Sequence, residues 1–233
     1  DRLPLVGGAR IVPYRQKIVN NTTGITGRTI DEPVNFRLGG RYQVSEAIAV
    51  HANWGESFSL NTGTDSSGAG FGPESGRGYE LGVAAKLPGI DVAATWFDIR
   101  KTDILTTDPN NANFLAPVGS IVSRGIELDA SARLGRGWQI VANYAWLDAE
   151  ADDAAFPTPE VLNVAAHSGT LLVVHRIPSR RGEWQVSGGV AYVGDRTGAV
   201  TQDPVILPGY VKAKAAVEAP LTQKLRLRVE ADN

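Results

Sequence analysis

The sequence predicts an all-β protein: a transmembrane antiparallel up-and-down β-barrel, of which this chain supplies about eleven strands. Three observations point to this class. Apolar and polar side chains alternate with a period of two along much of the 233-residue chain. Aromatic residues stand at both ends of several alternating stretches, and long connectors alternate with short ones. No apolar run approaches the ~18–20 residues of a membrane-spanning helix.

The stretch WQIVANYAW (138–146) shows the pattern most clearly. Because successive strand residues point to opposite faces, one face carries two tryptophans with apolar residues between them, namely Trp138, Ile140, Ala142, Tyr144 and Trp146. Eight residues separate the tryptophans, which is about 26 Å of strand. At a tilt of about 40° the vertical distance is roughly 20 Å, close to the apolar band of an outer-membrane barrel, which aromatic girdles flank on both sides.

The same spacing recurs in EWQVSGGVAYV, where Trp184 and Tyr192 are again eight residues apart on one face. The stretches AIAVHANW, YELGVAAKL, VSRGIELDASARL and KLRLRVEAD alternate in the same way. We therefore expect a membrane-interface girdle formed by Trp54, Trp138, Tyr144, Trp146, Trp184 and Tyr192.

One stretch, IDVAATWFDIR, fits the alternation less well. Its apolar face runs from Ile90 to Trp96 and then continues with Asp98 and Arg100, while Phe97 and Ile99 lie on the other face. The sequence favours either a β-bulge at this point or a strand that rises out of the membrane.

Alternation places the expected strands at about residues 9–19, 34–43, 46–58, 77–88, 90–103, 118–134, 137–150, 167–177, 183–195, 208–219 and 223–233. The connectors between them sort into long loops, such as LTTDPNNANFLAP, and short turns, such as LPG and GRG. Outer-membrane barrels have long extracellular loops and short periplasmic turns. A soluble β-sandwich has no reason to sort its connectors in this way.

Composition excludes several other classes of function. The net charge of −2 leaves no basic surface for nucleic acid. The absence of cysteine excludes a disulfide scaffold and a thiolate metal site. His51, His167 and His175 do not pair with one another or with carboxylates at metal-ligand spacing. We expect no catalytic residues, no metal site and no bound cofactor.

Several stretches in a fixed order also carry a family resemblance. They are GESFSL, PESGRGYELGVAAKL, ATWFDIRKTDIL, SRGIELDASARL, NYAWLDAE, VAYVGDR and ILPGYV. Together they resemble the C-terminal half of the barrel of TonB-dependent ferric-siderophore receptors, which has about 22 strands and a plugged lumen. The resemblance implies that residues 1–233 are a partial barrel domain, and that the plug domain, its TonB box and the last strand lie outside this chain.

The resemblance implies import of ferric siderophore complexes across the outer membrane of a Gram-negative bacterium. The energy would come from the TonB–ExbB–ExbD complex through the plug domain. The expected partners are a ferric siderophore, that complex and the lipid membrane, with no nucleic acid, and iron would arrive already chelated. Such a protein is a transporter and not an enzyme. A passive outer-membrane channel without a plug and a soluble secreted all-β binding domain are the alternatives.

In such a receptor the substrate would meet loops and rim residues rich in aromatic and arginine side chains. The candidates are Phe71, Arg77, Arg100, Phe114, Arg124, Phe156 and His167. The alternative for the phenylalanines is that they pack the loops onto each other. Glu127, Asp129 and Arg133 are expected to line the lumen, because charges at the midplane of the lipid face cost about 2–4 kcal/mol each.

Overall fold

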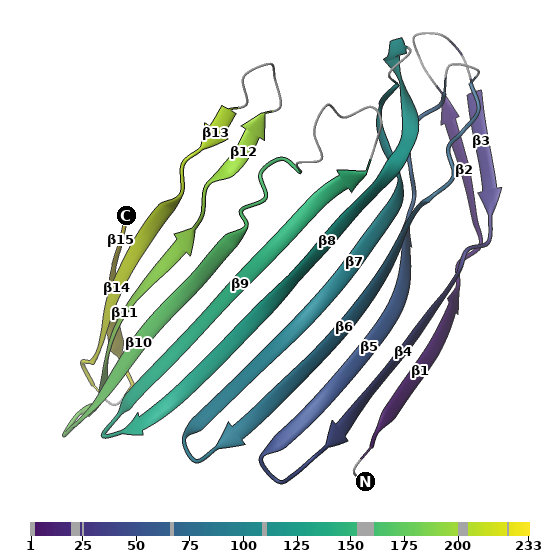
Figure 1. Ribbon diagram of the computed structural model, residues 1–233. Helices are drawn as coiled ribbons and strands as arrows, with labels where there is room; N and C mark the ends of the chain where they lie inside the picture. Colours follow the sequence, from purple (N-terminus) through teal and green to yellow (C-terminus); the bar gives the residue numbers. More distant parts are fainter. Residues whose placement is uncertain are drawn as a thin grey trace.

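The alternating stretches pair into one antiparallel sheet of eleven strands in the computed structural model (Figure 1). The order is β1-β4-β5-β6-β7-β8-β9-β10-β11-β14-β15, so every strand pairs with the next strand of the sheet along the chain. The structure describes residues 3–19, 24, 26–65, 68–108, 111–152, 161–199, 205–222 and 224–233.

The main sheet consists of β1 (Leu5–Ile11), β4 (Val34–Gln43), β5 (Ile48–Ser59), β6 (Glu74–Leu87), β7 (Ile90–Asp108), β8 (Asn111–Gly135), β9 (Trp138–Asp152), β10 (His167–Ser179), β11 (Gly182–Val193), β14 (Tyr210–Pro220) and β15 (Arg226–Asp232). Two separate hairpins pair β2 (Tyr14–Val19) with β3 (Thr26–Asp31), and β12 (Arg196–Ala199) with β13 (Val205–Leu207). Both hairpins stand at the same end of the sheet (Figure 1), which we call the loop end. The opposite end, where short turns join the strands, is the turn end.

The predicted all-β antiparallel fold is confirmed, with a correction to the first strand. The main-sheet strand is β1, which ends at Ile11, and residues 14–19 form β2 of a separate hairpin. The break falls at Pro13, which has no backbone N–H to donate to a neighbouring strand. Beside it, Val12 N donates to Pro33 O at 3.2 Å, so the chain leaves the sheet opposite the point where β4 begins.

A second correction concerns the stretch LTTDPNNANFLAP, which the sequence predicts to be a loop. Backbone pairing between β7 and β8 continues through most of it, from Ile104 opposite Val118 to Asp108 opposite Asn111. The hairpin therefore extends well beyond the neighbouring strands at the loop end (Figure 1).

Of the two alternatives for IDVAATWFDIR, the structure contradicts the β-bulge, and a strand that rises out of the membrane stays a prediction. Residues from Ile90 to Thr102 pair with β6 and with β8 without any shift of register. Asp98 and Arg100 therefore lie on the same face as Trp96, farther toward the loop end. The face itself changes from apolar to charged at this height.

The turn between β8 and β9 depends on a backbone conformation that favours glycine. Arg136 and Gly137 both have positive φ, at 47° and 83°, as in the type I′ turns that suit two-residue hairpins. Gly137 O accepts a hydrogen bond from Arg176 N at 2.8 Å. A Cβ added at Gly137 would lie 2.0 Å from Arg176 O.

We expect Gly137→Ala to reduce the yield of assembled barrel more than Gly135→Ala does. Both glycines have positive φ, at 83° and 77°, and an alanine at either position costs about 1–2 kcal/mol. Only Gly137 adds a steric clash, since a Cβ at Gly135 meets nothing within 4 Å. The measurement is the fraction of heat-modifiable, folded protein in the membrane. Equal losses for both variants would contradict the predicted clash.

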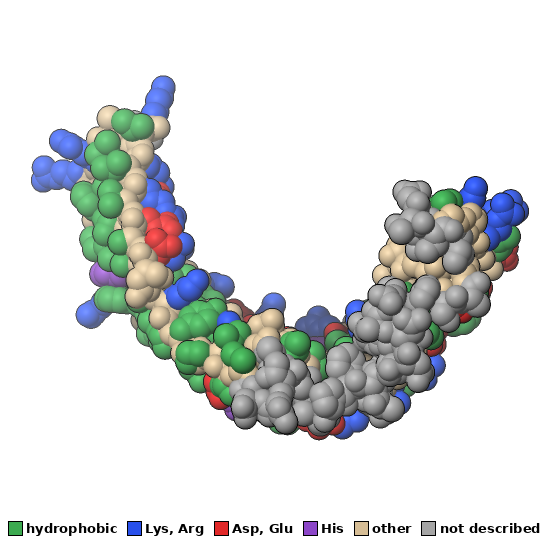
Figure 2. Space-filling model, turned by 90° about the horizontal axis from the view of Figure 1, so that it is seen from above, with side chains coloured by type: hydrophobic (Ala, Val, Ile, Leu, Met, Phe, Trp, Pro, Cys, Tyr) green, Lys and Arg blue, Asp and Glu red, His purple; other side chains and the backbone are tan. Residues whose placement is uncertain are grey.

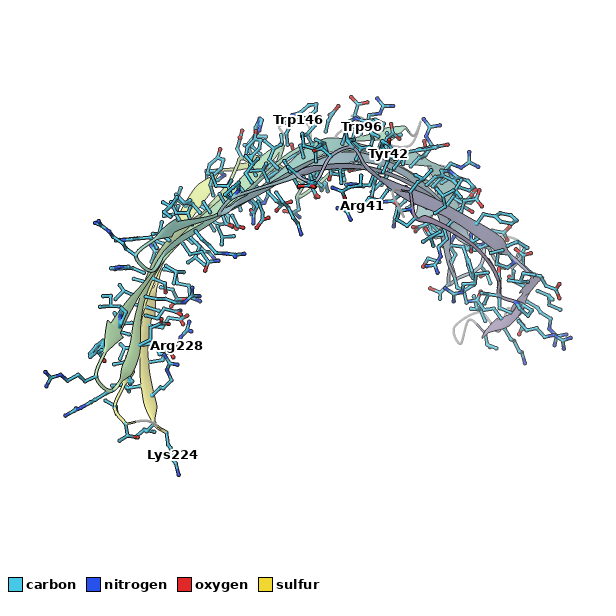
Figure 3. The ribbon with its side chains drawn as sticks, turned by 90° about the horizontal axis from the view of Figure 1, so that it is seen from below. Arg41, Tyr42, Trp96, Trp146, Lys224 and Arg228 are labelled. Atoms are coloured by element: carbon cyan, nitrogen blue, oxygen red, sulfur yellow. The ribbon has the colours of Figure 1, made fainter. Side chains whose placement is uncertain are left out.

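The sheet is strongly curved and has two chemically different faces. Seen from above, it forms an open trough (Figure 2), and β1 and β15 are its two edge strands. Trp96, Trp146 and Tyr42 point away from the hollow, whereas Arg41 and Arg228 point into it (Figure 3). We call these sides the convex and concave faces.

Cross-strand register extends this division over the sheet. From the turn end up to the level of Trp96, the convex positions of β5–β11, β14 and β15 carry no Asp, Glu, Lys or Arg. Large apolar side chains on this face are open to the surroundings, with Leu81 58% and Val229 62% exposed. The opposite face over the same height is rich in charges, which a lumen in water can solvate.

No second layer packs against either face within the described residues, and none of their large side chains is fully buried. A soluble sheet of this kind would hide its apolar face against a core. Here the apolar face is continuous and outward, as in a barrel wall in lipid, where only a closed sheet satisfies all backbone groups.

No helix long and apolar enough to cross a membrane is found in the described part of the chain.

Candidate functional site

Aromatic side chains mark two levels of the convex face. Toward the loop end, Trp146 lies opposite Ile126, which lies opposite Trp96. The members of this level are Trp54, Tyr79, Trp96, Tyr144, Trp146 and Tyr192. Trp138 and Trp184 lie at the turn end. The six predicted girdle residues thus share the convex face, and their anchoring role stays a prediction.

The predicted girdle leaves out several convex aromatics, among them Tyr42, Tyr79 and Trp96. Their position could have been found from alternation alone, because each shares the face of the apolar residues in its own strand. Figure 3 shows Tyr42 and Trp96 on the convex side, and Tyr79 lies directly opposite Trp54.

Two histidines also belong to the convex face. The Tyr144 hydroxyl and His167 Nδ1 are 2.7 Å apart and hydrogen bonded, which ties His167 to the aromatic level rather than to the hollow. At the turn end the His175 ring stacks on Trp138, with ring centroids 4.0 Å apart. His51 is on the concave face, opposite Arg41.

The three candidate arginines lie on the convex face, beyond the aromatic level. Arg124 Nε contacts Asp98 Oδ2 at 2.8 Å, and Arg77 Nη2 contacts Glu56 Oε1 at 3.5 Å. The arginine side chains of these pairs are more than half exposed, so each pair contributes at most about 1 kcal/mol. Arg100 lies opposite Arg77. Because the three arginine side chains point away from the hollow, we leave them out of the candidate substrate site.

The candidate phenylalanines have different positions. Phe71 is only 7% exposed, and Thr29 Oγ1 donates to its carbonyl oxygen at 3.4 Å. This packing between the β2–β3 hairpin and the loop before β6 fits the alternative of loop-to-loop contact. Phe156 lies outside the described residues, and Phe114 lies in β8 with its side chain outside the described part.

The predicted lumen residues do lie on the concave face. Glu127 and Asp129 alternate with the convex residues Ile126 and Leu128. Arg133 Nη2 approaches Asp91 Oδ2 across the sheet at 3.8 Å. Within the described ranges, no three His, Cys, Asp or Glu side chains are grouped so as to hold a metal ion.

Ion pairs cover the concave face of the last strands. Glu230 contacts Lys214 at 2.5 Å and Arg228 at 2.6 Å. Arg226 contacts Glu218 at 2.5 Å. Figure 2 shows acidic and basic side chains on the inner side of one arm of the trough, with hydrophobic side chains outside.

Nearer the loop end, the same wall carries a cluster that sequence reasoning missed. The Arg196 Cζ atom lies 5.7 Å from the centroid of the Tyr210 ring, and Lys212 Nζ lies 5.6 Å from it. We call these three residues the mouth cluster. Fourteen positions separate Arg196 from Tyr210 in the sequence, and the β12–β13 hairpin brings them together, so alternation within one strand could not reveal the contact.

Comparison with known proteins agrees with this architecture. Residues 1–233 match the family described as TonB dependent receptor-like, beta-barrel. The chain is 33% identical to the metal-pseudopaline receptor CntO of Pseudomonas aeruginosa strain UCBPP-PA14, over 97% of this chain and 34% of the relative. It is 28% identical to the ferrichrome outer membrane transporter/phage receptor of Escherichia coli K12, over 64% of this chain and 20% of the relative.

Solved structures share the fold. The ferripyoverdine receptor of the P. aeruginosa outer membrane, bound to ferripyoverdine, superposes with a TM-score of 0.81 at 19% identity, covering 100% of this chain and 32% of that one. The ferric yersiniabactin uptake receptor FyuA of Yersinia pestis gives a TM-score of 0.80 at 20% identity, covering 100% of this chain and 38% of that one.

The chain spans about a third or less of the length of the curated relatives named above. It corresponds to a part of their barrels, in agreement with the open, single-layered wall of eleven strands. On the match over its whole length, the chain belongs to the TonB-dependent receptor β-barrel family of outer-membrane proteins of Gram-negative bacteria.

Proposed function

We propose that the protein containing this chain imports metal–siderophore complexes across the outer membrane, and that these eleven strands form about half of its barrel wall. The energy would come from the TonB–ExbB–ExbD complex, acting through a plug domain in the lumen. The chelate would enter from the loop end, and metal would cross as part of the chelate rather than on protein ligands.

The observation that carries the proposal is that, from the turn end up to the level of Trp96, the convex face of the sheet carries no charged side chain while the concave face is charged, in a chain that matches this receptor family throughout. The first supplies a surface for lipid and the second a polar lining. Relatives named for metal-pseudopaline and ferrichrome indicate a chelated metal as the class of substrate.

Uptake of radiolabelled iron tests this function directly. The complete receptor gene is expressed in a Gram-negative strain that lacks its own siderophore receptors, under iron limitation and with ferric chelates supplied. We expect uptake and growth that stop when TonB is deleted or the proton-motive force is dissipated. An assembled receptor that supports no uptake of any metal chelate would contradict the proposal.

The same assay distinguishes a passive channel. Uptake through a channel without a plug would continue after TonB deletion, and it would show no saturation at micromolar chelate. The importer predicts saturable uptake, since the chelate must occupy a binding site before it crosses.

A further inference from the structure

The mouth cluster, Arg196 with Tyr210 and Lys212, lies on the concave wall at the loop end. Lys212 lies opposite Ala191 and Tyr210 lies opposite Val193, while the residue between them, Val211, lies opposite the convex Tyr192. Lys212 and Tyr210 therefore point to the hollow. The β12–β13 hairpin places the Arg196 side chain against the same ring.

Both cations of the cluster retain unused binding capacity. Neither Arg196 nor Lys212 makes an ion pair with any described residue, whereas other concave cations of the last strands, such as Lys214 and Arg226, do. Arg196 Nη1 is enclosed and has no hydrogen-bond partner among the described residues. A buried donor without a partner is costly, and a ligand acceptor would remove that cost once the Arg196 side chain turns this nitrogen toward the hollow.

The surrounding wall leaves room for such a ligand. The concave neighbours of the cluster on β11 and β10 are short side chains: Ala191 and Val193, then Thr170 and Ser168 opposite them. A bulky molecule in the hollow can therefore approach the Tyr210 ring and the two cations without displacing large side chains.

We infer that the mouth cluster binds the anionic groups of the imported chelate and thereby selects chelates of net negative charge. The inference rests on the proposed function and extends it to a class of substrate. Arg196 would pair with a carboxylate or phenolate oxygen, Lys212 would add a second positive charge, and the exposed Tyr210 ring would contact the flat parts of the chelate.

Binding titrations of the complete receptor in detergent test this inference. The probes are two anionic chelates, ferric citrate and the ferric tris-catecholate of enterobactin, and the neutral tris-hydroxamate ferrichrome. We expect an anionic chelate to bind most tightly. Its affinity should fall as the salt concentration increases. Arg196→Gln and Lys212→Gln should each weaken its binding about tenfold, and Tyr210→Ala should do so as well, whereas Tyr210→Phe should not.

Two controls isolate the effect of the cluster. Arg176→Gln removes a concave charge that is already paired with Glu183 near the turn end, and we expect it to change the dissociation constant less than about twofold. Heat-modifiable migration confirms that each variant is folded. All variants should leave ferrichrome binding, if any occurs, unchanged.

The outcomes separate this inference from the proposed function. Tightest binding of ferrichrome, or anionic binding that is unchanged in Arg196→Gln and Lys212→Gln, would overturn the selection of anionic chelates and leave import of chelates in place. Failure of the folded receptor to bind any of the three probes and to support uptake of any ferric chelate would overturn both.

Discussion

Val190→Arg is expected to reduce assembly of the barrel sharply. Val190 lies on the convex face of β11, opposite Leu171 and Ala213, and it is 44% exposed. An arginine on the lipid face costs about 1–2 kcal/mol at a depth between the interface and the midplane. That cost lowers the ratio of folded to unfolded protein roughly five- to thirtyfold.

The fraction of heat-modifiable protein in isolated outer membranes measures this effect. Thr170→Arg is the matched control, because Thr170 lies on the adjacent strand opposite Ala191 but on the concave face. It places the same side chain at nearly the same depth, where water can solvate it. Equal assembly of the two variants would show that Val190 does not face lipid.

Gly125→Val is expected to cost at least 1–3 kcal/mol of stability, as overpacking does elsewhere. Gly125 lies in β8 on the concave face, opposite Phe97. A Cβ at this position would lie 2.6 Å from Phe97 Cζ and 2.3 Å from the backbone oxygen of Trp146. The aromatic ring covers the glycine, a pairing that stabilises glycine within a strand, and a valine would displace it.

Urea unfolding of the purified receptor in lipid vesicles measures that loss. Gly78→Ala is the control in a nearby strand, since its Cβ would meet only Ile99 Cγ1 at an ordinary 3.6 Å. We expect a clear fall in the urea midpoint for Gly125→Val and little change for Gly78→Ala. An unchanged midpoint for Gly125→Val would mean that Phe97 does not pack on the glycine.

The strands of the membrane-facing wall could be predicted from sequence because lipid imposes one simple rule. Every second residue must be apolar, and Trp138–Trp146 and Trp184–Tyr192 keep that rule throughout. Beyond the aromatic level the strands no longer face lipid, so alternation is not required. The predicted strand boundaries were wrong in this region. The β7–β8 hairpin continues through polar residues that carry no lipid signal, and the alternation across Pro13 merged β1 with the β2–β3 hairpin.

The candidate site was less predictable for a related reason. The sequence prediction placed three arginines at a substrate rim because they lie close to the loops: Arg77, Arg100 and Arg124. Alternation along each strand already puts them on the convex face, together with Tyr79, Trp96 and Ile126. The mouth cluster depends on a contact between Arg196 and Tyr210 across the β12–β13 hairpin. That contact follows from three-dimensional folding, and no pattern within one strand encodes it.

From the turn end to the aromatic level, the convex face of the sheet should meet lipid and the concave face should meet water. The most direct test is a cysteine scan of β11 from Gln185 to Tyr192 in the assembled receptor, since the chain itself contains no cysteine. Each cysteine is spin-labelled, and its collisions with oxygen in lipid and with a water-soluble nickel complex are measured. We predict a strict alternation, with Val186 and Val190 accessible to oxygen, and Ser187 and Ala191 accessible to nickel. The reverse pattern, or no alternation at all, would show that lipid and water are not divided between the two faces in this way.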